Sequence, residues 1–453
     1  MKRFSLRKGL DVPISGEPKP EIDGDVPVRQ VGLIGEDYLG LKPRLSVAEG
    51  DAVVPGSPVF SDKDMPEVQI TSPVSGHIKA INRGARRKLI SIEIEIADHA
   101  GGAGEAGAPI DFSEVGDGST PEGLVERLCA AGLWTSFRTR PYSRVPQPET
   151  RPAAIYVTAT DTEPLAADPE PVIRAEAEAF SDGLRAISTL SDGETYLCHG
   201  DFADFPGSDL PGVEAVAFAG PHPAGLAGTH MHFLVPPGAQ RTVWTIGYQD
   251  VIVIGRLMRT GRYDPSCVVA LTGPACAAPR LIRTVAGASM VDLSAADVPA
   301  DRPVRLISGS VLSGRAGEGT SAYLGRYARQ VTVIDEDREQ IPLGWIRPMP
   351  GKYAVQPVLG SAWLRKLFPL TSNLNGGRRA MVPLGTFEEL MPQDILPTQL
   401  LRALVVMDTD QAQALGALEL DEEDVALLGF ACPAKYEYGI ALRDCLLRIE
   451  KEG

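Results

Sequence analysis

The sequence predicts a multidomain α/β protein made of four parts. Short strand-like runs separated by Gly and Pro fill the first 100 residues, alternating strand and helix patterns follow, and leucine-rich helical patterns close the chain. With 453 residues, the chain is long enough for several compact domains. We expect a β-barrel at residues 1–100, an α/β domain at 101–255, a small β-grasp domain at 256–335 and a largely helical region at 336–453.

The first part resembles a carrier domain. Apolar runs broken by Gly and Pro at Val47–Phe60 and Thr71–Ile78, with period-two alternation at Leu89–Ile96, predict half-buried strands joined by tight turns. Their order is similar to the flattened barrel of lipoyl and biotinyl domains, with Lys63 at the position of the modified lysine. Lys63 either carries lipoate or is a solvated turn residue of a barrel that serves as a rigid adaptor. Pro66 departs from the carrier pattern and favours the adaptor.

A basic run lies between two of the expected barrel strands. Four cations fall where a hairpin tip is expected: Arg83, Arg86, Arg87 and Lys88. Such a run is commonly a solvated surface, but it can also dock onto acidic protein or lipid headgroups. Residues 1–100 carry 14 Lys+Arg against 15 Asp+Glu, whereas residues 381–453 carry 5 against 14. The barrel is therefore the end that we expect to approach an anionic membrane surface.

The second part shows strands and helices in alternation. It follows a glycine-rich linker at Gly101–Pro109, and the pairs Thr120-Pro121 and Asp168-Pro169 are typical helix starts. Further elements are expected as strands at 153–159, 195–198 and 213–218 and as a helix at 250–259. This alternation predicts a Rossmann-like domain with a mainly parallel sheet.

The expected sheet lacks the usual nucleotide-binding signatures, because neither GxGxxG nor a P-loop is present. The densest chemical cluster is the loop Gly220–Phe233, which follows a strand and holds His222, His230 and His232. Open α/β sheets bind ligands at such a place. Three interpretations stay open: a zinc site, a structural loop, or a polar pocket for an apolar carbonyl compound. No Asp, Glu or Cys lies nearby in sequence, so we expect no metal.

The rest of the chain predicts a small β module and a helical end. Strand-like runs at Cys267–Gly273 and Val304–Gly314 flank a helical stretch, which is compatible with a β-grasp (SLBB-like) domain. An acidic helix start at Asp421–Asp424 and apolar residues at helical spacing in 442–449 predict helices near the end of the chain.

Composition limits the class of protein further. A formal net charge of −15 argues against nucleic acid as a partner. No stretch reads as a membrane span. The six cysteines are scattered and form no CxxC pair, which predicts free thiols in a reducing cytoplasm and no iron–sulfur or zinc-ribbon spacing.

Several motifs together resemble one family. They are Lys8–Ile14, Gly132–Thr135, Arg138–Pro141, Gly220–Phe233, Tyr323–Tyr327, Gln413–Asp424 and Lys435–Gly439. In this order they resemble the NqrA family of the sodium-translocating NADH:quinone oxidoreductase, over essentially the whole chain. The layout is also similar to RnfC and to the flavin subunit of respiratory complex I. Those relatives place a glycine-rich flavin loop where this chain has Leu133–Pro141, so that Trp134 and Phe137 would fill the flavin space.

The resemblance implies a role within a membrane-bound translocase. We expect a peripheral subunit on the cytoplasmic face of the bacterial inner membrane, bound to the other Nqr subunits and especially to NqrB, the integral-membrane one. The complex transfers electrons from NADH to ubiquinone and pumps Na⁺, whereas the isolated chain is expected not to be catalytic. NADH, flavins and iron–sulfur clusters are then carried by other subunits, this chain holds no covalent cofactor, and ubiquinone is the substrate.

The loop Gly220–Phe233 is the expected quinone site. A quinone headgroup is a flat dicarbonyl with an apolar tail, so its site needs an apolar slot with a few hydrogen-bond donors. The expected quinone-binding residues are His222, Gly225, Gly228, His230, His232, Phe233, Arg138 and Arg140. The sequence assigns no catalytic residue. Two alternatives remain: a lipoyl-type carrier that uses Lys63, and a stand-alone NADH dehydrogenase, which the missing nucleotide loop disfavours.

Overall fold

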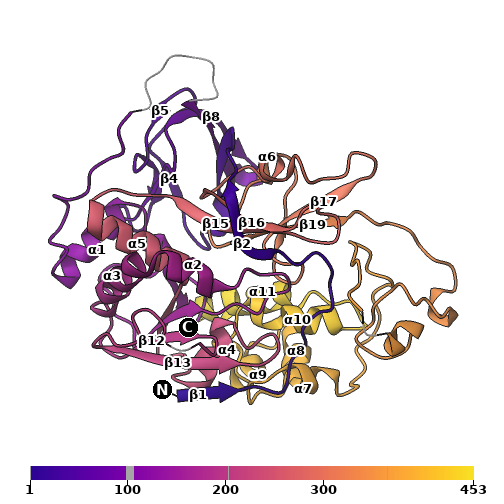
Figure 1. Cartoon of the computed structure of the whole chain (residues 1–453). Coiled ribbons are helices and arrows are strands. Elements are labelled where there is room, and N and C mark those ends of the chain that lie inside the picture. Colours follow the sequence, from indigo (N-terminus) through magenta and orange to yellow (C-terminus); the bar gives the residue numbers. More distant parts are fainter. Residues whose placement is uncertain (1, 98–106, 203, 365, 453) are drawn as a thin grey trace.

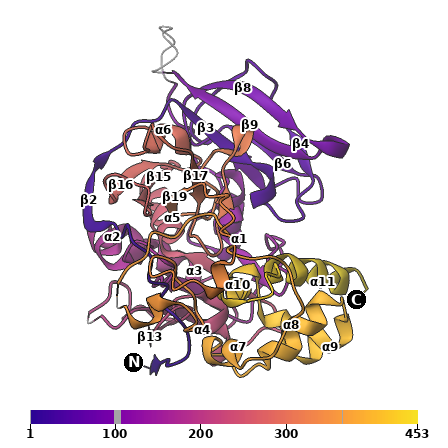
Figure 2. The same ribbon diagram turned by 90° about the vertical axis from the view of Figure 1, so that its right-hand side faces the viewer.

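The computed structural model describes residues 2–97, 107–202, 204–364 and 366–452. The barrel stands at the top of Figure 1, an α/β sheet with its helices lies below it, and a third sheet lies between the two. The C-terminal helices, drawn in yellow, lie beside the α/β domain, as the view in Figure 2 also shows. Residues 101–106 of the expected linker lie outside the described residues.

Two small antiparallel sheets form the barrel. The four-stranded sheet has the order β3 (Gln30–Ile34), β9 (Leu89–Ile96), β8 (Gly76–Arg83) and β5 (Ala52–Val53). The three-stranded sheet has the order β4 (Pro43–Leu45), β6 (Pro58–Asp62) and β7 (Gln69–Thr71). Their inward side chains, Phe60, Ile78 and Ile92 among them, are fully buried in a core shared with the third sheet. Lys63 is exposed in the turn between β6 and β7, and the basic run comprises the last residue of β8 and the turn that leads to β9.

The first 25 residues contribute strands to the other two sheets. β1 (Lys2–Ser5) pairs in parallel with β13 (Val213–Ala219) of the α/β domain. β2 (Lys19–Asp25) pairs in parallel with β16 (Arg280–Val285) of the third sheet. Both pairings join segments far apart in the chain, so the segment at 1–100 contributes strands to four sheets: the two of the barrel, the α/β sheet and the sheet between them.

The α/β sheet has six strands, and all but one are parallel. Their order is β1, β13, β12 (Thr195–His199), β11 (Ile155–Ala159), β14 (Val243–Gly247) and β10 (Arg138–Arg140), with β10 antiparallel to β14. One face packs against helices α3 (Ala177–Ser188) and α5 (Tyr248–Thr260). The other face packs against α4 (Ala227–Phe233) through Tyr156, Phe218 and Met231. The expected alternation of strands and helices is therefore present.

The local helix signals act as expected at two places. The Thr120 side chain accepts a hydrogen bond from the Gly123 amide and caps α1 (Pro121–Ala130). Asp168 caps the next helix in the same way, but that helix is interrupted at Glu176, which separates α2 (Pro169–Ala175) from α3. The expected loop Gly220–Phe233 is a loop only in its first half, because its second half is α4.

The third sheet also has six strands. Their order is β18 (Arg315–Ala316), β17 (Val304–Ser308), β19 (Gln330–Asp335), β15 (Ser266–Thr272), β16 and β2. The short helix α6 (Met290–Ser294) follows β16, so the stretch between the two expected strands is a strand and a short helix rather than a helix alone.

The C-terminal region begins with chain that has little regular structure and ends in a helical bundle. Among the described residues of 336–385, the regular elements are two short 3₁₀ turns, Gly344–Ile346 and Gly360–Trp363. The helices follow as α7 (Thr386–Leu390), α8 (Pro397–Val405), α9 (Thr409–Ala414), α10 (Glu422–Ala431) and α11 (Tyr438–Glu452). Their apolar faces form one core around Leu401, Leu404 and Leu442.

Two further expectations can be compared with the structure. All six cysteines are buried and unpaired, as the scattered spacing predicts. Within the described ranges, no helix combines the length and the apolar character needed to cross a bilayer.

Candidate functional site

A pocket of about 210 Å³ opens at the carboxyl ends of β11 and β14. This is the edge of a parallel sheet where ligands commonly bind. Thr158 of β11 and Ile246 of β14 form part of its floor, and Gly225 and Leu226, just before α4, form one wall. Ser310, just after β17, and Gln330, the first residue of β19, also line the pocket from the domain of the third sheet. The pocket is therefore lined by the α/β domain, by the domain of the third sheet and by Glu423 at the start of α10.

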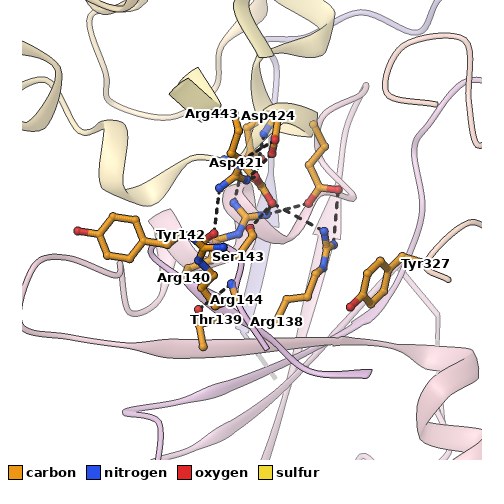
Figure 3. Close-up of polar contacts among 12 residues, drawn as sticks. Arg138, Thr139, Arg140, Tyr142, Ser143, Arg144, Tyr327, Asp421, Asp424 and Arg443 are labelled. Atoms are coloured by element: carbon orange, nitrogen blue, oxygen red, sulfur yellow. Dashed lines mark hydrogen bonds and ion pairs between the residues drawn. The ribbon is translucent and has the colours of Figure 1, made fainter. Parts of the chain in front are cut away.

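Arg138 brings a cation to this pocket from the edge strand β10. Its guanidinium carbon lies 4.7 Å from the centre of the Tyr327 ring, a cation–π distance, and its side chain is 26% exposed. The nearest carboxylate oxygens, those of Asp421 and Glu423, lie 3.7 and 3.9 Å from the guanidinium nitrogens of Arg138, close to the limit of an ion pair. Figure 3 shows Arg138 beside Tyr327. Part of its hydrogen-bonding capacity is thus free for a ligand.

Four carboxylates line the same pocket: Asp161, Glu163, Glu423 and Asp250, the last of which is described below. Glu163 accepts hydrogen bonds from the hydroxyls of Ser310 at 2.6 Å and Ser313 at 2.7 Å. Desolvation by the surrounding protein raises the pKa of each carboxyl to about 7, although the Asp161 residue keeps exposed surface at the pocket and Glu163 is half-buried. The charge of Glu163 adds to the effect of burial on the pKa of Asp161. Both groups can therefore take up or release a proton near neutral pH.

Asp250 at the start of α5 fixes another wall. Its carboxylate accepts hydrogen bonds from Arg326 at 2.7 Å, from Arg329 at 2.9 Å and from the Ser136 hydroxyl at 3.1 Å. Burial opposes the charge on Asp250, but the two guanidinium groups outweigh it and hold the pKa of this carboxyl below its usual value. Asp250 therefore stays ionised and ties the α/β domain to the third domain.

Arg140 lies behind the pocket in a buried ion-pair network. Its side chain has no exposed surface and pairs with Glu423 at 2.9 Å, Asp424 at 3.0 Å and Asp421 at 3.3 Å. Arg138 and Arg140 are two residues apart on β10, so their side chains lie on the same face of the strand. Both face the start of α10. Arg443 of α11 also binds Asp421, and Figure 3 shows both guanidinium groups directed at the acidic helix start.

The network sets the charge state of the acidic helix start. Burial opposes ionisation of Asp421, but Arg140 outweighs it and holds the pKa of this carboxyl well below its usual range. Burial raises the pKa of Asp424 to about 6 despite the same arginine. Because Arg140 already has three carboxylate partners, it positions α10 and is not free to bind a ligand.

The three histidines do not surround one opening. His222 and His230 are fully buried, and burial lowers their pKa to about 4 and about 3, so both imidazoles are neutral at pH 7. His230 Nε2 lies 3.0 Å from the Ala224 carbonyl oxygen. His232 lies between domains, with Nδ1 2.8 Å from Glu419 and Nε2 accepting from the Asp394 amide at 2.9 Å. Their arrangement is that of side chains held within the fold.

Of the three remaining expected residues, one lines the pocket and two pack against other side chains. Gly225 lines the pocket, and its amide donates to the Thr162 hydroxyl at 2.9 Å. Gly228 packs directly against the Asp424 carboxylate, and Phe233 packs against Phe4 with ring centres 5.4 Å apart. Of the expected site residues, only Arg138 and Gly225 line the pocket.

Sequence reasoning did not select the acidic residues of this pocket. One signal was available, since Asp161 and Glu163 come just after the strand that ends at Ala159 and polar residues at the carboxyl end of a parallel strand face the ligand edge. Glu423 carries no such signal, because it reaches the pocket from a helix more than 250 residues away. In the part of the chain that is described, no three His, Cys, Asp or Glu side chains are grouped to hold a metal.

Family models match three consecutive segments of the chain. The NqrA N-terminal barrel-sandwich hybrid domain matches residues 4–97, the NqrA second alpha/beta domain matches residues 119–263, and the NQRA C-terminal domain matches residues 268–318. The NqrA subunit of the Na⁺-translocating NADH-quinone reductase of Neisseria meningitidis serogroup A is 49% identical over 99% of this chain and 100% of its own length. The chain belongs to the NqrA family.

Other relatives agree with this assignment. The NqrA subunits of Pasteurella multocida and Rhodopirellula baltica are 48% and 47% identical over 99% of this chain, and the matches cover 100% and 98% of their own lengths. The expected family and the expected fold class, with a barrel, an α/β domain, a further β domain and C-terminal helices, are thereby confirmed.

Proposed function

We propose that the chain is the peripheral NqrA subunit of a Na⁺-translocating NADH-quinone reductase on the cytoplasmic side of the membrane. In this role it contributes to quinone binding and docks onto NqrB, the membrane part of the complex. The names of relatives that match over their full length support membership of the complex. The observation that carries the quinone role is the pocket at the carboxyl ends of β11 and β14, with Arg138 on its wall.

The size of the pocket favours a single ring. Sites for drug-sized ligands occupy about 300–1,000 Å³, whereas this pocket measures about 210 Å³. Such a volume favours a quinone headgroup over a dinucleotide or a flavin nucleotide. Leu226, Ile246 and the ring of Tyr327 offer apolar wall, and the Arg138 guanidinium can donate to a carbonyl oxygen.

The acidic wall suits the chemistry of a quinone. Reduction of a quinone to a quinol takes up two electrons and two protons, and we propose that other subunits supply the electrons. Asp161 and Glu163, each with a pKa of about 7, can hold protons at the wall of the pocket. We propose no redox cofactor in this chain. In support, Trp134 and Phe137 occupy the core at the position of the relatives' flavin loop, with ring centres 5.3 Å apart.

Replacing Arg138 with methionine is expected to weaken binding of a short-tailed ubiquinone analogue about tenfold. A hydrogen bond from a charged donor contributes about 1.5–3 kcal/mol, and about 1.4 kcal/mol corresponds to a factor of ten in Kd. The melting temperature should change little, because Arg138 is partly exposed and its ion pairs are long. Titration of the isolated chain by calorimetry measures both affinities.

Arg185→Met on α3 is the matched control, since its side chain is 61% exposed and lies outside the pocket. Its affinity should equal that of the unchanged chain. The same titration with His222→Gln and His232→Gln separates the pocket from the histidine loop as the quinone site. Loss of affinity in these two variants but not in Arg138→Met would assign the quinone to the loop and overturn the pocket proposal.

Reversal of the basic run tests the proposed docking role of the barrel. Changing Arg83, Arg86, Arg87 and Lys88 to glutamate should reduce the fraction of the chain that co-purifies with membranes of cells that make the whole complex. The protein should remain folded, because exposed charges contribute only about 0–1 kcal/mol each. Normal assembly of the fourfold variant would place the docking surface elsewhere on the chain.

A further inference from the structure

The segment between the third sheet and the helical bundle exposes an unusual amount of apolar surface. Of the thirteen large apolar side chains that are exposed in the described part of the chain, nine lie within residues 341–385, which we call the apolar arm. Trp363 is 88% exposed, Val358 75% and Leu374 67%. Large apolar patches on a soluble surface commonly mark binding sites. The arm is therefore a candidate contact surface.

The charge of the apolar arm differs from that of the rest of the chain. It contains six Lys and Arg and no Asp or Glu, in a chain whose formal net charge is −15. Arg347, Lys366 and Arg379 are exposed, and Arg378 lies at the long ion-pair distance of 3.8 Å from Glu437. A surface of this kind attracts an acidic partner.

The apolar arm is held to the body of the protein at several points. The Asp337 carboxylate accepts hydrogen bonds from Thr371 at 2.9 Å, Lys352 at 3.1 Å and Asn373 at 3.1 Å. A hydrogen bond from the Glu339 amide, together with these side-chain bonds, holds the pKa of Asp337 far below its usual value. Phe368 is buried, and its backbone forms hydrogen bonds with Pro13 and Ser15 at 2.8 and 3.0 Å.

An anchoring and an exposed side chain are neighbours in the arm at Phe368 and Leu367. Phe368 turns inward, and its ring lies 5.5 Å from Tyr353, which itself lies 6.3 Å from Phe430 of the helical bundle. Its chain neighbour Leu367 is 57% exposed. In Figures 1 and 2 the arm, in orange, runs across the side of the molecule that carries the yellow helices. The apolar surface thus has a fixed position on the protein.

The composition of the arm favours a protein over a lipid bilayer as its partner. Protein interfaces are enriched in aromatic residues, Met and Arg and depleted in Asp and Glu. The arm also contains six Pro and six Gly, and its described residues form little regular structure, so its backbone polar groups could not be satisfied inside a hydrocarbon layer.

We infer that the apolar arm is a docking surface for another protein subunit of the complex, one that presents an apolar face with an acidic rim. The inference rests on the proposed docking role and adds a second surface to it, distinct from the basic run of the barrel. The apolar side chains supply the buried centre of the interface, and the arginines and lysines pair with the acidic rim.

The test uses the assembled complex and the double variant Trp363→Ser/Leu367→Ser. Both side chains are exposed, so the melting temperature of the isolated chain should not change. The fraction of the variant that co-purifies with the membrane subunits should fall at least about tenfold, the factor that corresponds to about 1.4 kcal/mol. The matched control is Val291→Ser/Ile440→Ser, which removes two apolar side chains that are 56% and 60% exposed outside the arm and should assemble like the unchanged chain.

Hydroxyl-radical footprinting adds a direct measurement. Oxidation of Trp363 should be rapid in the isolated chain and several times slower in the complex. Normal assembly of the double variant, or equal protection of Trp363 by anionic phospholipid vesicles alone, would overturn the inference, and so would protection through self-association of the isolated chain. Failure of the unchanged chain to co-purify with the membrane subunits would instead refute the docking role itself.

Discussion

Replacing Arg140 with alanine is expected to lower the free energy of unfolding by about 3–5 kcal/mol, the cost of breaking a buried ion pair on one side. The substitution leaves Asp421 and Asp424, both buried, without their main cation and leaves Glu423 without its nearest one. It also releases the contact between β10 and the start of α10. Urea unfolding followed by circular dichroism measures the change.

The loss of stability should depend on pH. Without Arg140, burial raises the pKa of Asp424 further above its value in the unfolded chain, and the pKa of Asp421 rises because the main group that holds it low is gone. A carboxylic acid with a raised folded-state pKa stabilises the fold at low pH and loses this contribution as pH rises through that pKa. The difference between the variant and the unchanged chain should therefore be larger at pH 8 than at pH 5.

Arg138→Ala is the control for Arg140→Ala, because it removes an arginine from the same strand. Its carboxylate contacts are 3.7 Å or longer and its side chain is partly exposed, so the expected loss is below about 1 kcal/mol. Equal losses in the two variants would show that the buried network does not hold α10 in place.

The same network shows what local sequence signals can and cannot predict. The acidic helix start at Asp421 is visible in the sequence, because a capping residue acts on the next few amides of its own chain. Its partner Arg140 lies 281 residues earlier, and no local pattern joins the two. The sequence therefore predicted the helix correctly. It also selected Arg140, but as a quinone-binding residue and not as the partner of this helix.

For the strands and helices too, local patterns were visible in the sequence and long-range contacts were not. Alternation of period two identified β9, because a strand with one buried face carries apolar residues at every second position. β1 was not expected, since it is a four-residue edge strand whose place depends on pairing with β13. The short helix α4 was also missed, because its Gly- and His-rich sequence is a poor helix former and packing of Met231 under the sheet stabilises it instead.

The location of the pocket was predictable, but its chemistry was not. The alternation of strands and helices places a ligand edge at the carboxyl ends of β11 and β14. The walls, however, come from elements of three domains, with Glu163, Ser310 and Glu423 brought together only by the fold. The histidines of the loop attracted attention as polar residues, and burial makes two of them neutral members of the core.

Gly255→Ala in α5 is expected to lower the free energy of unfolding by about 3 kcal/mol, at the upper end of the range for overpacking. Helices α3 and α5 approach closely at Gly183 and Gly255. A Cβ added at Gly255 would overlap the carbonyl oxygen of Ala179, and one added at Gly183 would overlap that of Val251. A backbone carbonyl cannot rotate away as a side chain can, so the helices must separate.

The control is Gly429→Ala in α10, which is the same substitution inside another helix. The nearest atom to the added Cβ there is the Tyr436 carbonyl oxygen at 3.8 Å, an ordinary contact distance. Without a clash, the better helix propensity of Ala should raise the stability by up to about 1 kcal/mol. The two variants should thus differ in the sign of their effect, measured by urea unfolding under the same conditions. A stabilising Gly255→Ala would mean that α3 and α5 are farther apart than their backbone contacts require.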